Sequence, residues 1–376
     1  MTATLRLRNR DFQLIGEIQG FEDFKASLRF NNRDAWSLTG WVPDMEFDRE
    51  TMRGIVLDVD GTIILSGPIW SFQQVGKARS NTYTLQGFSD DFWMDARLAL
   101  PVVTGPPYTA SDQDRITTNA ENMMHHYVGR NAGPLAKSER QVAGLTMAAN
   151  QGRGQTFAGY ARFNDLTLIL NAISVANKTL GGDELGWRIV QVGNGIQFQV
   201  YVPVDRSATA KFSTEFGNLD AFDFLETGPR VNYAIVGGGG EGTARVFSEV
   251  GESVSMTKWG RVEQFVDQRS TSVATELAQK RDEVIEEGKG STHLSVYPVD
   301  TSQLRYPTGY GLGDKVTVVV SGIPVVDLIR EIDLNVKPTG VMTVIPKIGS
   351  SDMRGPVGFF RQLSEMRKRL GNLESR

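Results

Sequence analysis

The first hundred residues alternate apolar and polar side chains in short runs, and turn residues separate these runs. In residues 24–43, "FKASLRFNNRDAWSLTGWVP", one alternating run ends at an Asn-Asn-Arg-Asp turn and a second run follows. A period of two places successive side chains on opposite faces of a strand. The chain also has 40 glycines among its 376 residues, which supplies the turn residues that many short strands need. This pattern favours a β sandwich or barrel over residues 1–104.

The middle of the chain changes character after a segment rich in Pro, Ser and Asp at residues 102–114. Residues 117–133 predict a helix, with Thr before the helical run and Gly after it. A second helix is predicted where Leu166, Ile169, Leu170 and Ile173 recur at helical spacing before a Gly-Gly pair. Asn194-Gly195 then predicts the turn of a hairpin. Residues 105–212 are therefore expected to form an α/β domain.

The β pattern returns after residue 212 and continues to residue 348. This second β module, residues 213–348, contains a charged segment that predicts a helix at 271–288. Residues 349–376 are expected to form a linker and a C-terminal helix with one apolar stripe. The stripe consists of Phe359, Phe360, Leu363, Met366 and Leu370. The fold class that follows is α+β, mainly β.

Composition excludes several classes of protein. The net charge is −4, so no basic surplus points to specific nucleic-acid binding. The absence of cysteine excludes a disulfide framework, a thiol nucleophile and Cys-ligated zinc. The N-terminus has no apolar core of a signal peptide. The most apolar window, residues 316–329, is interrupted and too short for a membrane span, so we expect a soluble product that is not secreted by the usual route.

Residues 54–67, "GIVLDVDGTIILSG", contain the letters of an active-site motif. They match the nucleophile motif of haloacid-dehalogenase-like phosphatases, in which Asp58 would attack phosphorus and Asp60 would act as the general acid. That fold needs a crossover helix after the motif, whereas a second β run follows here. The next acidic pair, Asp90-Asp91, comes too soon for the metal site of a doubly wound fold. An Asp-Gly pair at Asp60 between apolar strands is also a hairpin signal, and we expect a hairpin.

Two further patterns suggest chemistry that their context does not support. Gly237, Gly239 and Gly242 satisfy G-x-G-x-x-G after a strand, but a dinucleotide site needs a helix to begin there, and the following residues are strand-like. We expect a hairpin tip or a close backbone approach. His125 and His126 are adjacent on a predicted helix, so their side chains diverge and cannot bind one metal. We therefore expect no catalytic, cofactor-binding or metal-ligating residues and no cofactor, and a structural protein that is not an enzyme.

Several stretches, in this order along the chain, resemble the siphovirus tail or baseplate hub family of actinobacterial phages. They are "LRFNNRDAWSLTGWVP", "GIVLDVDGTIILSGPI", "GFSDDFWMDARLALP", "NAGPLAKSERQVAGLTMA", "ARFNDLTLILNAI", "FSTEFGNLDAFDF", "VGGGGEGTARVF", "RVEQFVDQRST" and "YGLGDKVTV". The resemblance implies a fold like the hub protein of contractile phage baseplates. It makes residues 1–104 a first tail-tube-like β-barrel, 105–212 an intervening α/β domain, 213–348 a second tube-like barrel, and 349–376 the linker and C-terminal helix.

The resemblance also implies a function. The chain would be a virion structural protein, a homotrimeric baseplate hub at the tail tip, synthesised and assembled in the host cytoplasm. Its partners would be the distal tail protein, the C-terminus of the tape-measure protein and other tail-tip proteins, with no specific nucleic-acid binding and no membrane span. The alternatives are a tail-associated cell-wall hydrolase or carbohydrate-binding tip protein, and a haloacid-dehalogenase-like phosphatase.

Overall fold

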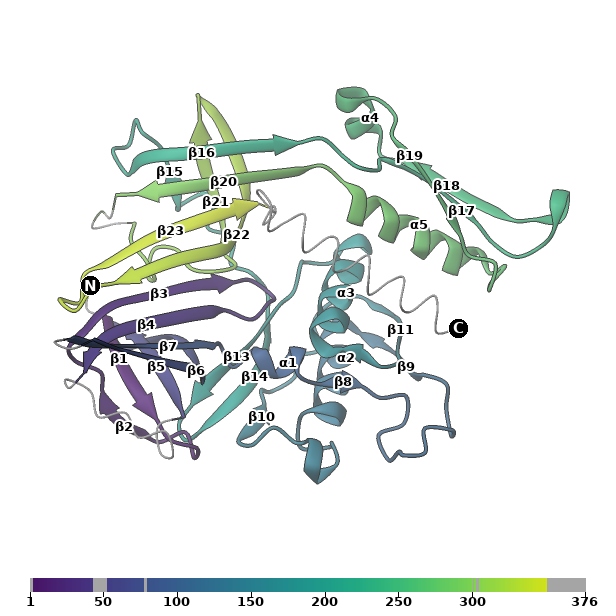
Figure 1. The fold of residues 1–376 in the computed structure, drawn as a ribbon. Coiled ribbons are helices and arrows are strands. Elements are labelled where there is room, and N and C mark those ends of the chain that lie inside the picture. The colour runs from purple at the N-terminus through teal and green to yellow at the C-terminus, as the bar shows by residue number, and fades with distance from the viewer. Residues whose placement is uncertain (1–2, 43–52, 78–79, 300, 302–303, 350–376) are drawn as a thin grey trace. The chain divides into compact units, whose positions relative to one another are not determined.

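The structure is a computed structural model that describes residues 3–42, 53–77, 80–299, 301 and 304–349 (Figure 1). The predicted C-terminal helix lies outside these residues. The described chain separates into two compact units. The first contains the described residues within 1–222 and 296–347, and the second contains those within 223–295 together with 348 and 349. The four-part division at residues 104, 212 and 348 stays a prediction.

Most of the strands belong to one large sheet. Along its main path the strand order is β16-β20-β23-β22-β3-β4-β7-β6-β5-β1-β2, with β21 beside β22 and β15 beside β21. The strands of its N-terminal half are β1 (Ala3–Arg8), β2 (Leu14–Glu17), β3 (Phe21–Arg29), β4 (Ala35–Val42), β5 (Gly54–Val59), β6 (Thr62–Lys77) and β7 (Ser80–Phe88). The later ones are β15 (Lys211–Phe212), β16 (Leu219–Thr227), β20 (Ser291–Pro298), β21 (Lys315–Val320), β22 (Ile323–Val336) and β23 (Met342–Gly349).

The alternation seen in the sequence produces the buried face of this sheet. Phe24 and Leu28 of β3, Leu38 of β4, and Leu85 of β7 are all buried, and polar residues lie between them along each strand. β22 continues the pattern with Ile332, Leu334 and Val336 buried. The mainly β, α+β fold class is thereby confirmed.

The expected layout of two separate barrels is not confirmed by the strand pairing. β22, from the predicted second β module, pairs antiparallel with β3 from the first, with Ile332 opposite Leu28. Both modules therefore contribute to one sheet, and in the described part of the chain no set of strands closes into a barrel. The reason is a pairing between strands about three hundred residues apart, which no local sequence pattern reports.

The α/β part of the first unit is built on two helices, α2 (Ala120–Asn131) and α3 (Leu166–Thr179). Both predicted helices are confirmed; α2 begins after Asn119, whose side chain accepts the N–H of Asn122. They share a buried core with a sheet of order β10-β14-β13. The remaining elements here are α1 (Phe92–Asp95), β8 (Leu98–Ala99), β9 (Asp114–Asn119), β10 (Leu145–Met147), β11 (Thr156–Ala161), β12 (Asn164–Asp165), β13 (Gly186–Val192) and β14 (Gly195–Tyr201), with a 3₁₀ turn at Ser138–Arg140.

The predicted hairpin after α3 is present, but its turn lies one residue earlier than expected. Val192 pairs with Gly195, so the two loop residues are Gly193 and Asn194. Gly193 has a φ of 57°. Because only this first loop residue has a positive φ, the turn resembles type II′, which prefers Gly at that position.

The second unit contains a three-stranded sheet of order β18-β17-β19 and two helices (Figure 1). These elements are β17 (Tyr233–Gly237), β18 (Phe247–Gly251), β19 (Glu263–Asp267), α4 (Ser253–Trp259) and α5 (Ala274–Gly288), with a 3₁₀ turn at Gly242–Ala244. The helix expected at 271–288 is α5, which begins three residues later. Across the described residues of both units, no helix has the length and apolar character needed to cross a membrane.

Candidate functional site

The phosphatase-like stretch is a β-hairpin. β5 and β6 pair antiparallel, and Val59 opposite Thr62 leaves Asp60 and Gly61 as the two loop residues. Both have positive φ angles, 49° and 85°, as a type I′ turn requires. The Asp58 carboxylate accepts the backbone N–H of Gly61 at 2.7 Å, so it holds the turn. The parallel sheet and crossover helix of the phosphatase fold do not surround this motif.

The glycine-rich stretch forms the tip of a second hairpin. β17 and β18 pair antiparallel with Gly237 opposite Phe247, so the strand is followed by another strand and not by a dinucleotide-binding helix. The Arg245 guanidinium donates to the carbonyl oxygens of Gly237 and Gly238, at 3.0 Å each. A Cβ on Gly238 would stand 2.8 Å from the Thr271 carbonyl oxygen, so glycine is needed for a close backbone approach.

The two adjacent histidines make different contacts, as their spacing predicts. The Nε2 of His126 lies 3.1 Å from both carboxylate oxygens of Asp114. The ring of His125 packs edge-on against Phe198, and burial lowers the pKa of its imidazole. Among the described residues, no cluster of three or more His, Asp or Glu side chains has the geometry to hold a metal ion.

Asp90 and Asp91, considered above only as a possible metal pair, are part of a buried polar network. Asp90 is fully buried. Its carboxylate accepts hydrogen bonds from both terminal nitrogens of Arg8, at 2.9 and 2.5 Å, and from the Ser66 hydroxyl at 2.7 Å. Arg8 also donates to Gln191 Oε1 at 2.8 Å. Since Gln191 belongs to β13, the network connects β1 of the large sheet with the α/β part of the same unit.

Asp91 and Asp34 extend this network. Asp91 accepts the Ile189 backbone N–H at 2.5 Å and the Ser89 hydroxyl at 3.1 Å. The Ser89 hydroxyl in turn accepts the backbone N–H of Asp34 at 2.9 Å. Burial raises the pKa of the Asp34 carboxyl to about 7, and burial together with the nearby Asp34 charge raises the pKa of Asp91. The arrangement therefore joins two parts of the fold.

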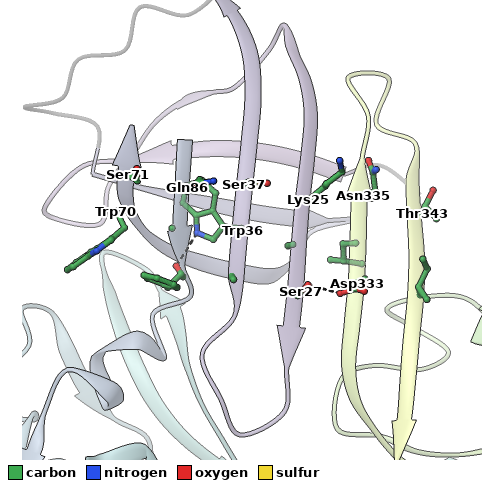
Figure 2. Close-up of a pocket in the computed structure, with 16 residues that line it drawn as sticks. Lys25, Ser27, Trp36, Ser37, Trp70, Ser71, Gln86, Asp333, Asn335 and Thr343 are labelled. Atoms are coloured by element: carbon green, nitrogen blue, oxygen red, sulfur yellow. Dashed lines mark hydrogen bonds between the residues drawn. The ribbon is translucent and has the colours of Figure 1, made fainter. Parts of the chain in front are cut away.

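An open groove runs across one face of the large sheet (Figure 2). Its cavity measures about 620 Å³. The strand register places a polar cross-strand row in it, from Asn335 through Lys25, Ser37 and Gln86 to Ser71. A neighbouring Ser27 hydroxyl donates to Asp333 at 2.6 Å.

Trp70 lies at one end of this groove (Figure 2). It falls at an irregularity in the β6–β7 register between Ile69 and Ser71, and its side chain is 60% exposed. Its ring centroid is 4.7 Å from that of Phe92. The groove thus combines hydroxyl and amide groups with an exposed indole. The described lining has one carboxylate and no histidine, so it offers contacts for binding and lacks a nucleophile–base pair.

Apolar side chains are also exposed on the strands at the two ends of the main path. β2 exposes Leu14 and Ile15, and β16 exposes Phe222, Phe224 and Leu225. Exposed edge strands with apolar side chains are unusual in monomers because they can pair with another chain. Sequence reasoning missed these edges, since a strand order cannot be read from local alternation. In chemical terms the molecule offers surfaces for protein association.

Comparison with known proteins finds a family model and several solved structures that are similar to this chain. The family model for Siphovirus ReqiPepy6 Gp37-like proteins matches residues 4–350. A tail protein from Neisseria meningitidis MC58 has 13% identity and a TM-score of 0.57, over 93% of this chain and 97% of that one. The 43 kDa tail protein of prophage MuSo2 from Shewanella oneidensis has 10% identity and a TM-score of 0.57, over 92% and 97%.

A third solved structure, prophage tail protein gp18 from Listeria monocytogenes EGD-e, has 11% identity and a TM-score of 0.54, over 98% of this chain and 100% of that one. At these identities the three likenesses concern the fold alone. No curated protein sequence matches the chain.

Proposed function

This chain belongs to the Siphovirus ReqiPepy6 Gp37-like family, as the resemblance in its sequence predicted, and from this membership we propose that it is a structural protein of a phage tail that acts as the hub at the tail tip. The observation that carries the proposal is the full-length similarity of fold to tail proteins. Three such proteins match over more than nine tenths of both chains, so the likeness extends beyond one shared domain.

The surfaces of the molecule support an assembly role. A hub joins a ring of identical subunits to the parts above and below it, and it therefore needs several separate contact surfaces. The exposed strands β2 and β16 and the groove that contains Trp70 are such surfaces. The buried network around Arg8 and Asp90 supports the same role, because it holds the α/β part firmly on the large sheet.

The finer features of the proposal come from the family resemblance. Three copies would form a ring, and the modules at 1–104 and 213–348 would together present a pseudo-sixfold face to the tail tube. The distal tail protein, the tape-measure protein and other tip proteins would be the neighbours in the virion, after assembly in the host cytoplasm. The chain would have no enzymatic activity and no catalytic residue.

Immunogold electron microscopy and cryo-electron microscopy of intact virions test this proposal. We expect antibody against the chain to label one end of the tail, and we expect three copies related by a threefold axis in the reconstruction. Label along the whole tail, absence from purified virions, or a dimeric or sixfold arrangement of this chain would contradict the hub role.

A carbohydrate-binding role at the tip is the second candidate, because Trp70 is exposed beside polar side chains. Sugar rings have apolar C–H faces and hydroxyl edges, and an indole next to hydroxyl and amide groups complements both. Binding of purified host cell-wall glycan, measured for the wild type and for Trp70→Ala with Trp259→Ala as the control, separates this candidate from the hub. Zymography on peptidoglycan tests the cell-wall hydrolase.

A further inference from the structure

Among the described residues of the second unit, one helix packs along one face of the three-stranded sheet. Helix α5 lies on that face, where Val231, Ala234 and Val284 form a buried cluster. The Arg281 guanidinium of α5 also donates to the Ser248 hydroxyl of β18 at 3.3 Å. Because successive side chains of a strand point to opposite faces, the neighbours of Ala234 and Ser248 along their strands point away from α5.

The opposite face carries two exposed aromatic rings. Phe247 is paired with Gly237, and Phe265 is paired with Ile235, so these side chains share one face. Phe247 is 57% exposed and Phe265 is 53% exposed. We call the surface formed by Ile235, Phe247 and Phe265 the open face. Met256 of α4 approaches the sheet at Gly251, and the described residues include no element that covers the two phenylalanines.

An arginine lies over both rings of the open face, and acidic residues lie beside them. The Arg245 guanidinium lies 5.6 Å from the Phe247 ring centroid and 5.5 Å from that of Phe265, and it pairs with Asp267. Both rings are thus held in place before anything binds, which reduces the entropy cost of binding. Glu249, paired in register with Ile235, is exposed and shares this face. Glu263 and Asp267 of β19 are exposed beside Phe265, where Glu263 pairs with Arg261 and Asp267 also pairs with Arg269. Among the described residues, this leaves Glu249 as the acidic residue of this face that is outside an ion pair.

The C-terminal residues of the chain complement this surface in pattern and charge. Residues 350–376 contain six basic and three acidic residues, a net charge of +3, whereas residues 223–295 contain eight basic and 12 acidic residues, a net charge of −4. Without Phe360, the apolar stripe of the sequence analysis continues to Leu373 at alternating spacings of four and three residues, and from here the stripe means Phe359, Leu363, Met366, Leu370 and Leu373. As a helix, this 15-residue stretch would extend about 22 Å, and the five-residue strands are about 17 Å long.

We propose that residues 356–376 dock as a helix on the open face, with the apolar stripe on Phe247 and Phe265 and the basic residues toward the acidic residues beside these rings. The stripe covers about two heptads, fewer than a sustained coiled coil requires, and a helix this short is marginal alone in water. It therefore needs a surface to order it. Docking would convert the two-layer sheet and helix into a three-layer unit and enlarge its small core. The proposal does not depend on the tail function.

Disulfide trapping in the full-length chain tests the docking directly, since the chain contains no cysteine that would interfere. Glu249→Cys on the open face and Met366→Cys on the stripe form the test pair. Gln264→Cys with Met366→Cys is the matched control, because Gln264 precedes Phe265 on β19 and is paired with Ala234, on the α5 side. We expect rapid oxidation of the test pair, at least about tenfold faster than that of the control pair.

Electrophoresis without reductant identifies which copy donates the segment. A cross-linked monomer indicates docking within one chain, and a cross-linked dimer that requires both cysteines indicates docking on a neighbouring copy. Efficient dimer formation by Met366→Cys alone would instead indicate pairing of the C-terminal segments with one another and would overturn the proposal. Equal rates for test and control pairs, or no disulfide in either, would overturn it as well.

A second measurement avoids introduced cysteines. Trypsin cleaves after Arg367, Lys368 and Arg369, and docking should protect these bonds. We expect Phe247→Ser with Phe265→Ser to speed this cleavage several-fold while the circular dichroism of the protein stays unchanged. Val254→Ser, which removes a side chain that is 74% exposed on α4, should leave the cleavage rate unchanged. Cleavage of the wild type as fast as that of the double variant would contradict docking.

Discussion

Replacing Asp34 with asparagine is expected to stabilise the protein at neutral and alkaline pH. Asp34 lies in the turn between β3 and β4 and is 6% exposed. Its Oδ1 accepts the backbone N–H of Arg29 at 2.7 Å, a bond that an asparagine oxygen can also accept. Burial raises the pKa of its carboxyl to about 7, and the charge of Glu331 acts in the same direction. The folded protein therefore favours the neutral form of this side chain.

The direction of the pH dependence follows from this raised pKa. In the unfolded chain the pKa of the carboxyl returns to about 3.8. Between pH 4 and pH 7 the folded state therefore holds a proton that the unfolded state has lost. The free energy of unfolding thus falls as pH rises through this window. The full difference between a pKa of about 7 and one of 3.8 corresponds to at most about 4 kcal/mol above pH 7. Asp34→Asn removes this loss, and the Asp91 carboxyl also loses the repulsion that raises its pKa.

Urea unfolding of the wild type and of Asp34→Asn at pH 5 and at pH 8 measures the effect. We expect the free energy of unfolding of the variant, relative to that of the wild type, to be higher at pH 8 than at pH 5 by about 1 to 4 kcal/mol. Asp60→Asn is the control, since it removes the same charge from an exposed turn. A variant whose stability relative to wild type is the same at both pH values would refute the reasoning.

Five further variants probe the fold. Arg8→Met leaves the buried Asp90 carboxylate without its cation and should lower the free energy of unfolding by about 3 to 5 kcal/mol, with partial recovery in Arg8→Met/Asp90→Asn, both measured by urea unfolding. A Cβ at Gly67 would stand 1.8 Å from the carbonyl oxygen of Phe88, so Gly67→Ala should lower the melting temperature, at a cost of about 1 to 3 kcal/mol or more. Asp58→Asn keeps an oxygen for the turn amide and should leave the free energy of unfolding nearly unchanged, whereas Asp58→Ala should lower it by about 1 kcal/mol. A phosphatase activity of the wild type that both variants lose would contradict the hairpin interpretation.

Local features of the fold could be predicted from the sequence because their causes are local. The spacing of Leu166, Ile169 and Ile173 predicted α3, since helical geometry places these positions on one side whatever the rest of the chain does. The Asp60-Gly61 turn was predictable because few residues adopt two successive positive φ angles. At residues 193–195 the sequence Gly-Asn-Gly fits two registers of a two-residue loop, and the observed one places Gly193 first.

Contacts between distant segments could not be predicted, because the residues next to each partner in the sequence do not indicate which distant segment it will meet. Arg8 and Asp90 are 82 residues apart, and in the sequence each is an ordinary charged residue. Their burial depends on the pairing of β1 with β5 and β5 with β6, which brings Ser66 and Arg8 to the same carboxylate. The open face around Phe265 was missed for a similar reason, since the alternation of β19 does not show which of its faces α5 covers.

The phosphatase-like motif at residues 54–67 shows that one sequence pattern can satisfy the structural requirements of two different folds. In this hairpin the apolar run is needed because β5 is buried, and Asp58 is needed to accept the turn N–H of Gly61. Asp60 and Gly61 supply the two positive φ angles, and Thr62, which is β-branched, begins the next strand. Each named residue of the Asp-x-Asp-Gly-Thr motif therefore has a structural role in the hairpin. The feature that separates the two interpretations is the element that follows, because a nucleophilic aspartate in that fold requires a crossover helix and a two-residue turn requires an antiparallel strand.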